Sequence, residues 1–131
     1  IPKSGTSLIP KSGTSLIPMI YSLTANYAIW YKSHMVARLI HREKHILPDG
    51  SDVEMVIWKL PRKTPERPHG IKYRLYCGLQ DGRCLVRYDN ESGKGDHRHY
   101  KNREVPYRFI DVETLIRDFL RDVAKARRSS S

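Results

Sequence analysis

The sequence predicts an α+β fold: a four-stranded antiparallel β meander with a C-terminal amphipathic helix packed on one face. Three observations lead to this fold class. Four segments between residues 36 and 88 are rich in β-forming residues and are separated by turn or proline-rich sequences. Residues 112–123 carry apolar side chains at helical spacing. The chain has 131 residues, which suits a single domain.

The first two predicted strands form a hairpin. Residues 36–47 form the first strand, with Leu39 and Ile46 as apolar anchors. Residues 48–51 contain an Asp-Gly pair, which is a strong signal for a tight turn. Residues 52–60 form the second strand, and we place its Trp58 in the core.

The third and fourth predicted strands follow a loop at 61–70 that contains three prolines. In residues 71–79 the apolar side chains alternate with polar ones and share one face: Ile71, Tyr73, Leu75 and Cys77. A turn at 80–83 leads to a strand at 84–88. We expect Cys77 and Cys84 to be small buried residues in adjacent strands; a disulfide or a role as metal ligands is the alternative.

The helix is predicted after a polar segment. Residues 90–107 are charged and contain glycine, and we expect an ordered functional loop there. The aromatic residues of 106–109 then close the core. Asp111 is a good N-cap for a helix that ends near Ala126. One helical face carries an apolar stripe of Val112, Leu115, Ile116, Phe119, Leu120 and Val123.

The N-terminal part of the chain is a different kind of sequence. The octapeptide at 1–8 repeats unchanged at 9–16, and 12–31 carries no charge. One interpretation of this segment is a signal peptide or a membrane span. The preferred interpretation is a flexible extension, derived from a tag or vector, that ends before Met35 as the natural first residue. Met19 is the alternative first residue. We therefore expect one domain at 35–128, preceded by a non-native extension at 1–34 and followed by a disordered tail at 129–131.

The charge points to a polyanionic partner. The formal net charge is +10, and the segment 35–128 holds all but three of the basic residues. Nucleic acid, an anionic membrane or an acidic protein would each suit that charge. Two cysteines are too few for a disulfide-dense scaffold or a four-cysteine zinc ribbon.

The segment 88–100 carries the densest chemistry, and RNA cleavage without a metal is the first interpretation. That reaction needs a base, an acid and cations near the phosphate. His97 and His99 project to the same side of an extended segment and suit the proton transfers. Lys94 and Arg98 can hold the phosphate, while Asp96 and Glu91 can orient the histidines or the loop. Lys72, Arg74, Arg87 and Arg108 are candidates to bind the RNA backbone.

Three other interpretations remain open for the same segment. Imidazole and carboxylate groups (His97, His99 and Asp96, or Asp89 and Glu91) can bind a transition metal. A basic sheet face and loop can grip nucleic acid or an acidic protein without chemistry. The charged residues can also form a network that only attaches the loop to the sheet. The working hypothesis assigns neither a metal nor another cofactor.

Several motifs together resemble the TumE family. They are Glu54-Met55-Val56-Ile57-Trp58-Lys59, Pro68-His69-Gly70-Ile71-Lys72-Tyr73-Arg74, Tyr88-Asp89-Asn90-Glu91, Gly93-Lys94-Gly95-Asp96-His97-Arg98-His99 and Pro106-Tyr107-Arg108-Phe109. The resemblance covers residues 35–123. It implies a toxin of a type II toxin–antitoxin module, encoded beside a helix-turn-helix antitoxin that neutralises it.

These inferences combine into one hypothesis. We expect a cytoplasmic toxin that inhibits growth as an endoribonuclease and is bound by its cognate antitoxin. A homodimer is compatible with this hypothesis. The alternative is a non-enzymatic module that binds nucleic acid or protein, either as a binding poison or as an accessory to a DNA-binding partner.

Overall fold

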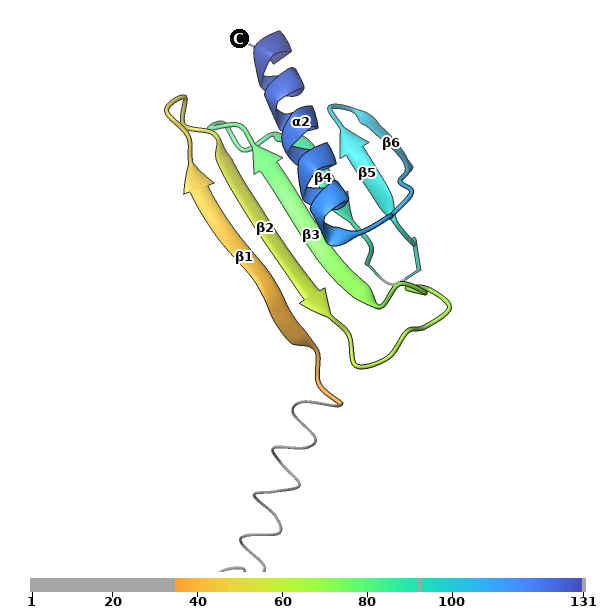
Figure 1. The fold of residues 1–131 in the computed structure, drawn as a ribbon. Helices are drawn as coiled ribbons and strands as arrows, with labels where there is room; N and C mark the ends of the chain where they lie inside the picture. The colour runs from red at the N-terminus through yellow and green to blue at the C-terminus, as the bar shows by residue number, and fades with distance from the viewer. Residues whose placement is uncertain (1–34, 92, 131) are drawn as a thin grey trace, which may run out of the picture. The chain divides into compact units, whose positions relative to one another are not determined.

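The structure, a computed structural model, describes residues 35–91 and 93–130. Within these residues, six antiparallel strands form one sheet in the order of the sequence (Figure 1). The strands are β1 (Arg38–Ile46), β2 (Asp52–Lys59), β3 (Ile71–Gly78), β4 (Cys84–Asp89), β5 (His97–Tyr100) and β6 (Arg103–Pro106). One helix, α2 (Val112–Ser130), follows them. The predicted α+β class, meander order and C-terminal helix are therefore confirmed.

The predicted number of strands was wrong, because the expected loop at 90–107 contains β5 and β6. Each of these strands has only four residues, HRHY and REVP, and neither shows an apolar alternation. Charged, half-exposed side chains are typical of strands near the edge of a sheet, so hydrophobic pattern does not mark them. The other four strands lie where they were predicted, with ends shifted by one or two residues.

Both Asp-Gly hairpin turns are confirmed. Gly50 has a φ of 85° and Gly82 a φ of 94°, in the left-handed region that glycine adopts without steric cost. The first turn is closed by the amide of Leu47, which donates to the carbonyl of Ser51 over 2.8 Å. These turns set the register of the β1–β2 and β3–β4 hairpins.

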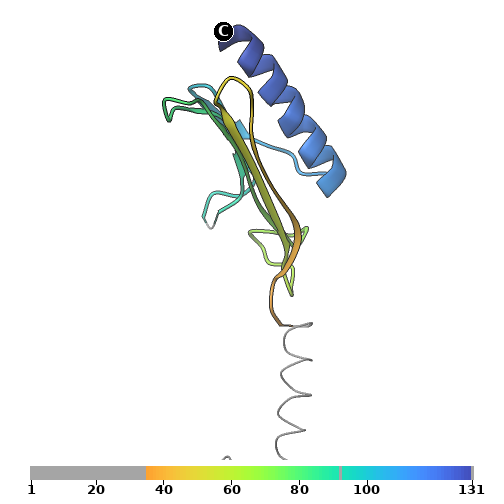
Figure 2. The ribbon, with the colours of Figure 1, turned by 90° about the vertical axis from the view of Figure 1, so that its left-hand side faces the viewer.

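The core lies between α2 and one face of the sheet. Figure 2 shows the helix on one side of the sheet and the β4–β5 connection on the other. Directly opposed side chains of neighbouring strands fill the interface, as at Met55–Leu75 and Leu75–Tyr88. The helix contributes its predicted stripe, of which Leu115 and Phe119 are fully buried.

The ends of α2 are explained by capping and charge. The amide of Thr114 donates to Asp111 Oδ1 over 2.7 Å, so Asp111 is the N-cap as predicted. The helix was expected to end near Ala126 but includes Ser129 and Ser130. Arg127 and Arg128 in its last turn interact favourably with the helix dipole.

The face of the sheet opposite α2, here called the open face, is not covered by any element of the described part of the chain (Figure 2). Trp58 lies on this face, so its predicted place in the core was wrong. Successive side chains of a strand point to opposite faces, and Ile57 is fully buried against the helix. Trp58 is consequently half-buried on the open face.

Several predictions concern residues outside the described ones. They include the repeat at 1–16, the uncharged stretch at 12–31, the nature of the extension at 1–34 and residue 131. Among the residues that the structure does describe, no helix has both the length and the apolar character needed to cross a membrane.

Candidate functional site

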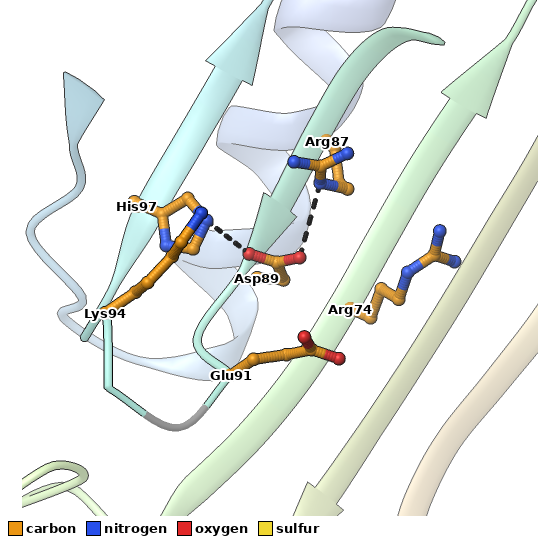
Figure 3. A pocket seen from close by; sticks show the side chains of 6 residues that line it. All are labelled: Arg74, Arg87, Asp89, Glu91, Lys94 and His97. Atoms are coloured by element: carbon orange, nitrogen blue, oxygen red, sulfur yellow. Dashed lines mark ion pairs between the residues drawn. The ribbon is translucent and has the colours of Figure 1, made fainter. Parts of the chain in front are cut away.

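A hollow of about 350 Å³ lies on the open face where β3, β4, β5 and the β4–β5 loop meet (Figure 3). We call it the open-face pocket. Its lining combines cations, carboxylates and an imidazole: Arg74, Arg87, Asp89, Glu91, Lys94 and His97. Strand register explains the grouping, because Arg74 lies opposite Asp89 and Asp89 lies opposite His97. All of these residues except Asp89 were predicted from the sequence as catalytic or nucleic-acid-binding residues.

His97 is held on both ring nitrogens. Its Nδ1 lies 3.0 Å from the carbonyl oxygen of Gly95, which only accepts, so Nδ1 carries a proton. Its Nε2 lies 2.6 Å from Asp89 Oδ1 and 2.9 Å from Glu104 Oε2. The ring is only 8% exposed. Both ring nitrogens therefore face acceptors, and these contacts fix the orientation of the His97 ring.

Asp89 is buried at the floor of the pocket between two cationic groups. Figure 3 shows its carboxylate between His97 and Arg87, whose Nε lies 3.3 Å from Asp89 Oδ2. These ion pairs are close, but Asp89 Oδ1 and Arg87 Nε have no partner with hydrogen-bond geometry among the described residues. Because buried polar atoms are nearly always hydrogen-bonded, this pair of atoms is suited to a polar ligand in the pocket.

The loop between β4 and β5 shapes the pocket mouth. Gly93 and Gly95 both have positive φ, at 89° and 72°, so the backbone bends sharply on each side of Lys94. Lys94 is exposed, and its Nζ lies 3.6 Å from Glu104 Oε2. Glu66 accepts a hydrogen bond from the amide of Gly93 over 2.7 Å. The loop therefore presents Lys94 to the pocket while staying attached to the 61–70 segment.

Asp96 lies in a separate network and contacts neither His97 nor His99 within the described contacts. Its Oδ2 lies 3.0 Å from His69 Nε2, and its Oδ1 accepts from the hydroxyl of Tyr73 over 2.8 Å and from the amide of Asn90 over 3.1 Å. His69 Nδ1 accepts from the amide of Ile71, so Nε2 is its protonated nitrogen. Burial and the Asp96 carboxylate raise the pKa of Tyr73.

Sequence reasoning assigned no role to His69, Asn90 or Arg67. The ring of His69 stacks on Phe109 with centroids 4.0 Å apart. Arg67 is 8% exposed, and its Nε donates to the carbonyl of Asn90 over 3.0 Å. No local spacing connects residues 67–69 with residues 90–96; only the motif Pro68-His69-Gly70 in the family resemblance pointed to this segment. These contacts anchor the loop beside the pocket.

Arg98 lies on the helix side of the sheet, away from the pocket. Its Nη1 donates to Asp122 Oδ2 over 2.7 Å, and the hydroxyl of Tyr88 donates to the same oxygen over 2.6 Å. Burial and the bond to Asp122 raise the pKa of Tyr88. Arg98 thus connects β5 to α2, and the structure does not bring it together with His97 and Lys94.

His99 shares the open face with His97 but borders a different hollow, of about 440 Å³, near the β3–β4 turn. In the sheet register it lies between Arg87 and Glu104. Two residues along a strand span roughly 6.6 Å, so the two histidines are neighbours without a direct contact.

The other residues singled out in the sequence, two cations and two cysteines, lie in different parts of the fold. Lys72 is exposed on the open face of β3, beside Arg74. Arg108 is exposed in the connection between β6 and α2, outside the strands that carry Lys72, Arg74 and Arg87. Both cysteines are free thiols in adjacent strands; Cys77 is buried as expected, whereas Cys84 is only half-buried. Across residues 35–91 and 93–130, no three His, Cys, Asp or Glu side chains are placed to hold a metal ion.

The fold and the pocket define a small basic α+β protein whose uncovered sheet face carries a polar, cation-rich pocket. In comparisons with family models, residues 36–127 match the family described as Toxin TumE. The match covers most of the chain, so this chain belongs to the TumE toxin family, and the resemblance in its motifs is confirmed. Membership supports a toxin role and implies an antitoxin partner in general terms. No curated protein and no solved structure matches the chain.

Proposed function

We propose that this toxin inhibits growth by cleaving RNA in the open-face pocket, without a metal. The observation that carries the proposal is the imidazole of His97, held between Asp89 and Glu104. Cations surround the same hollow. Acid–base groups beside cations are what phosphodiester cleavage requires.

The proposed reaction uses the 2′-hydroxyl of the RNA as the nucleophile. The base takes the 2′-hydroxyl proton, the 2′-oxygen bonds to the adjacent phosphorus, and the bond from phosphorus to the 5′-oxygen breaks. The acid then protonates the leaving 5′-oxygen. His97 and His99 share these roles, and Asp89 holds the His97 ring in position.

In this proposal Arg87, Arg74 and Lys94 stabilise the negative charge of the phosphate, because all three line the pocket. Lys72 contacts the RNA backbone further along β3. Glu91 borders the pocket, and Asp96 acts through the loop that it anchors. Arg98 has a structural role in the proposal, because it faces α2.

Glu104 lies beside the open-face pocket, in a hollow that shares Lys94 and His97 with it, and occupies the position of an anion there. Its Oε2 contacts both His97 Nε2 and Lys94 Nζ, and its side chain is 41% exposed. A phosphate oxygen would make the same two contacts once Glu104 turned away. We expect Glu104→Gln to bind RNA about twofold to fivefold more tightly, since it removes a competing charge that is partly screened by solvent. Fluorescence anisotropy with a labelled RNA measures this, and weaker binding would contradict the anion-mimic role.

The proposed partner is a cognate helix-turn-helix antitoxin that covers the basic open face of the toxin in the cytoplasm. Co-purification tests this without relying on toxicity: the antitoxin should no longer bind the toxin when the surface cations Lys72 and Arg74 are replaced by glutamate, if it binds there through acidic side chains. A complex that survives both replacements would place the antitoxin elsewhere.

The test of cleavage is induction of the full chain in bacteria with total RNA followed over time. The double variant His97→Ala/His99→Ala should neither arrest growth nor fragment RNA. His97→Asn is the matched variant, because its amide can still donate to the Gly95 carbonyl while the imidazole ring is lost. RNA cleavage by a folded His97→Asn protein would refute the role of His97.

One observation favours a second function, a binding poison. Both ring nitrogens of His97 already face acceptors, so the residue also works as a cross-link between β4, β5 and β6. A purified ribonuclease cleaves many RNA molecules per protein, whereas a binding poison acts one for one. Loss of cleavage in EDTA, restored by a divalent metal, would instead support a metal-dependent reaction.

A further inference from the structure

Trp58 is a large aromatic side chain on the open face with no assigned role. It is half-buried near the end of β2. Within the described residues its ring makes no aromatic or cation–π contact, and its indole N–H has no hydrogen-bond partner. The other aromatic residue on the middle of this face, Tyr76, is already covered, since the guanidinium of Arg74 lies 5.0 Å from its ring centroid. Trp58 is therefore the aromatic surface still available to a ligand.

Exposed cations lie near Trp58 on both neighbouring strands, although its direct partner on β1 is the exposed apolar Leu39. Lys72 lies directly opposite it on β3, and Arg74 follows two residues further along the same face. On the other side of β2, Arg42 of β1 lies opposite Val56, which is the next residue on this face. An aromatic ring among cations complements a ligand that alternates flat bases with phosphates.

We infer that Trp58 stacks with an unpaired base of a single-stranded RNA whose backbone runs across the open face to His97. This inference deepens the proposed function and rests on it. Single strands are the fitting ligand because the bases of a duplex are stacked on each other and their faces are not available. Lys72 and Arg74 contact the phosphates between the stacked base and the pocket.

Sheet geometry sets the spacing between the two contacts. Trp58 and His97 are three strands apart, and their positions in the register differ by two residues along the strands. With about 4.8 Å between strands and about 3.3 Å per residue, the two backbone positions are roughly 16 Å apart. This exceeds the reach of a single nucleotide, so a dinucleotide bound in the pocket cannot also stack on Trp58.

Binding is tested on the full chain by tryptophan fluorescence. The chain has two tryptophans, and Trp30→Phe leaves Trp58 as the only one. In a Trp30→Phe/His97→Asn protein, which cannot cleave in the proposal, a single-stranded oligouridylate should quench Trp58. Equal quenching by a double-stranded RNA of the same length, or no quenching, would overturn the inference.

Cleavage separates this inference from the proposed function. Trp58→Ala should raise KM for an oligonucleotide about tenfold, with kcat unchanged, and should leave cleavage of a dinucleotide unaffected. Trp58→Phe should retain most of the affinity. Leu120→Ala, which removes a 43% exposed apolar side chain from α2, is the control and should change neither parameter.

The outcomes are distinct. An unchanged KM in a folded Trp58→Ala protein refutes the stacking site and leaves RNA cleavage at His97 standing. Quenching of Trp58 by single-stranded RNA together with no cleavage by the unmodified chain refutes the ribonuclease and supports the stacking site of an RNA-binding toxin.

Discussion

The contrast between Arg98 and Arg87 yields the sharpest prediction. The two arginines lie on adjacent strands, but Arg98 faces α2 and Arg87 lines the open-face pocket. Arg98 shares Asp122 Oδ2 with the fully buried ring of Tyr88. If this geometry determines function, replacing Arg98 lowers stability and spares RNA cleavage, while replacing Arg87 does the reverse.

The magnitudes follow from burial. A hydrogen bond to a charged partner contributes about 1.5–3 kcal/mol, and a hydroxyl left buried without a partner costs a similar amount. The Asp122 side chain is 10% exposed, so Asp122→Ala should lower the free energy of unfolding by about 3 kcal/mol. The Arg98 side chain is 37% exposed, so solvent screening reduces the cost of Arg98→Ala to about 1 kcal/mol.

The assay is urea denaturation followed by circular dichroism, on both single variants and the double variant. In Asp122→Ala, Arg98 loses its charged partner and keeps only the Tyr88 hydroxyl at 3.3 Å, so its replacement there should cost about 1 kcal/mol less than in the unmodified chain. RNA cleavage and binding are measured on the same proteins, with Arg87→Ala as the matched control. A stable Arg98→Ala protein that has lost cleavage would refute the reasoning and place Arg98 in the reaction.

Two further predictions concern titration. The hydroxyl and amide of Ser51, followed by Arg127, lower the pKa of Asp49 from 3.8 to about 2. The depressed pKa means that the Asp49 carboxylate stabilises the fold above about pH 4 and loses its effect as the pH falls towards 2. The Tm difference between Asp49→Asn and the unmodified chain should therefore disappear near pH 2. A Tm difference that stays constant with pH would contradict this role of Asp49. Burial raises the pKa of Cys77 to about 11 and also raises that of Cys84. Iodoacetamide at neutral pH should label the buried Cys77 quickly only after unfolding, and fast labelling of Cys77 in the native protein would count against its burial.

The strands that could be predicted are those whose side chains alternate around the core. In 71–78 every second residue is apolar and buried, so the pattern alone placed the strand and its inward face. The same rule places Ile57 inside and Trp58 outside, but the size of tryptophan outweighed the alternation in the prediction. Strands β5 and β6 have no such pattern because their four residues each are mostly polar and, apart from the buried His97, half-buried or exposed.

The candidate site could be predicted only where its residues are close in sequence. Lys94 and His97 belong to one loop and its following strand, and both border the pocket. Arg98 was grouped with them because the segment was expected to be a loop. In a strand, a residue next to His97 must face the opposite side of the sheet, and there it meets Asp122.

By itself, the sequence determined the fold class, the two Asp-Gly turns, the helix and its cap, and the TumE motifs, because each depends on residues within a few positions of one another. Only the tertiary structure decided that His97 lies between Asp89 and Glu104 and that Arg87 and Arg74 border the same pocket. These side chains come from four different segments, and the register of the strands brings them together. The physical reason is that pairing between strands is non-local: one residue of register turns every side chain to the other face.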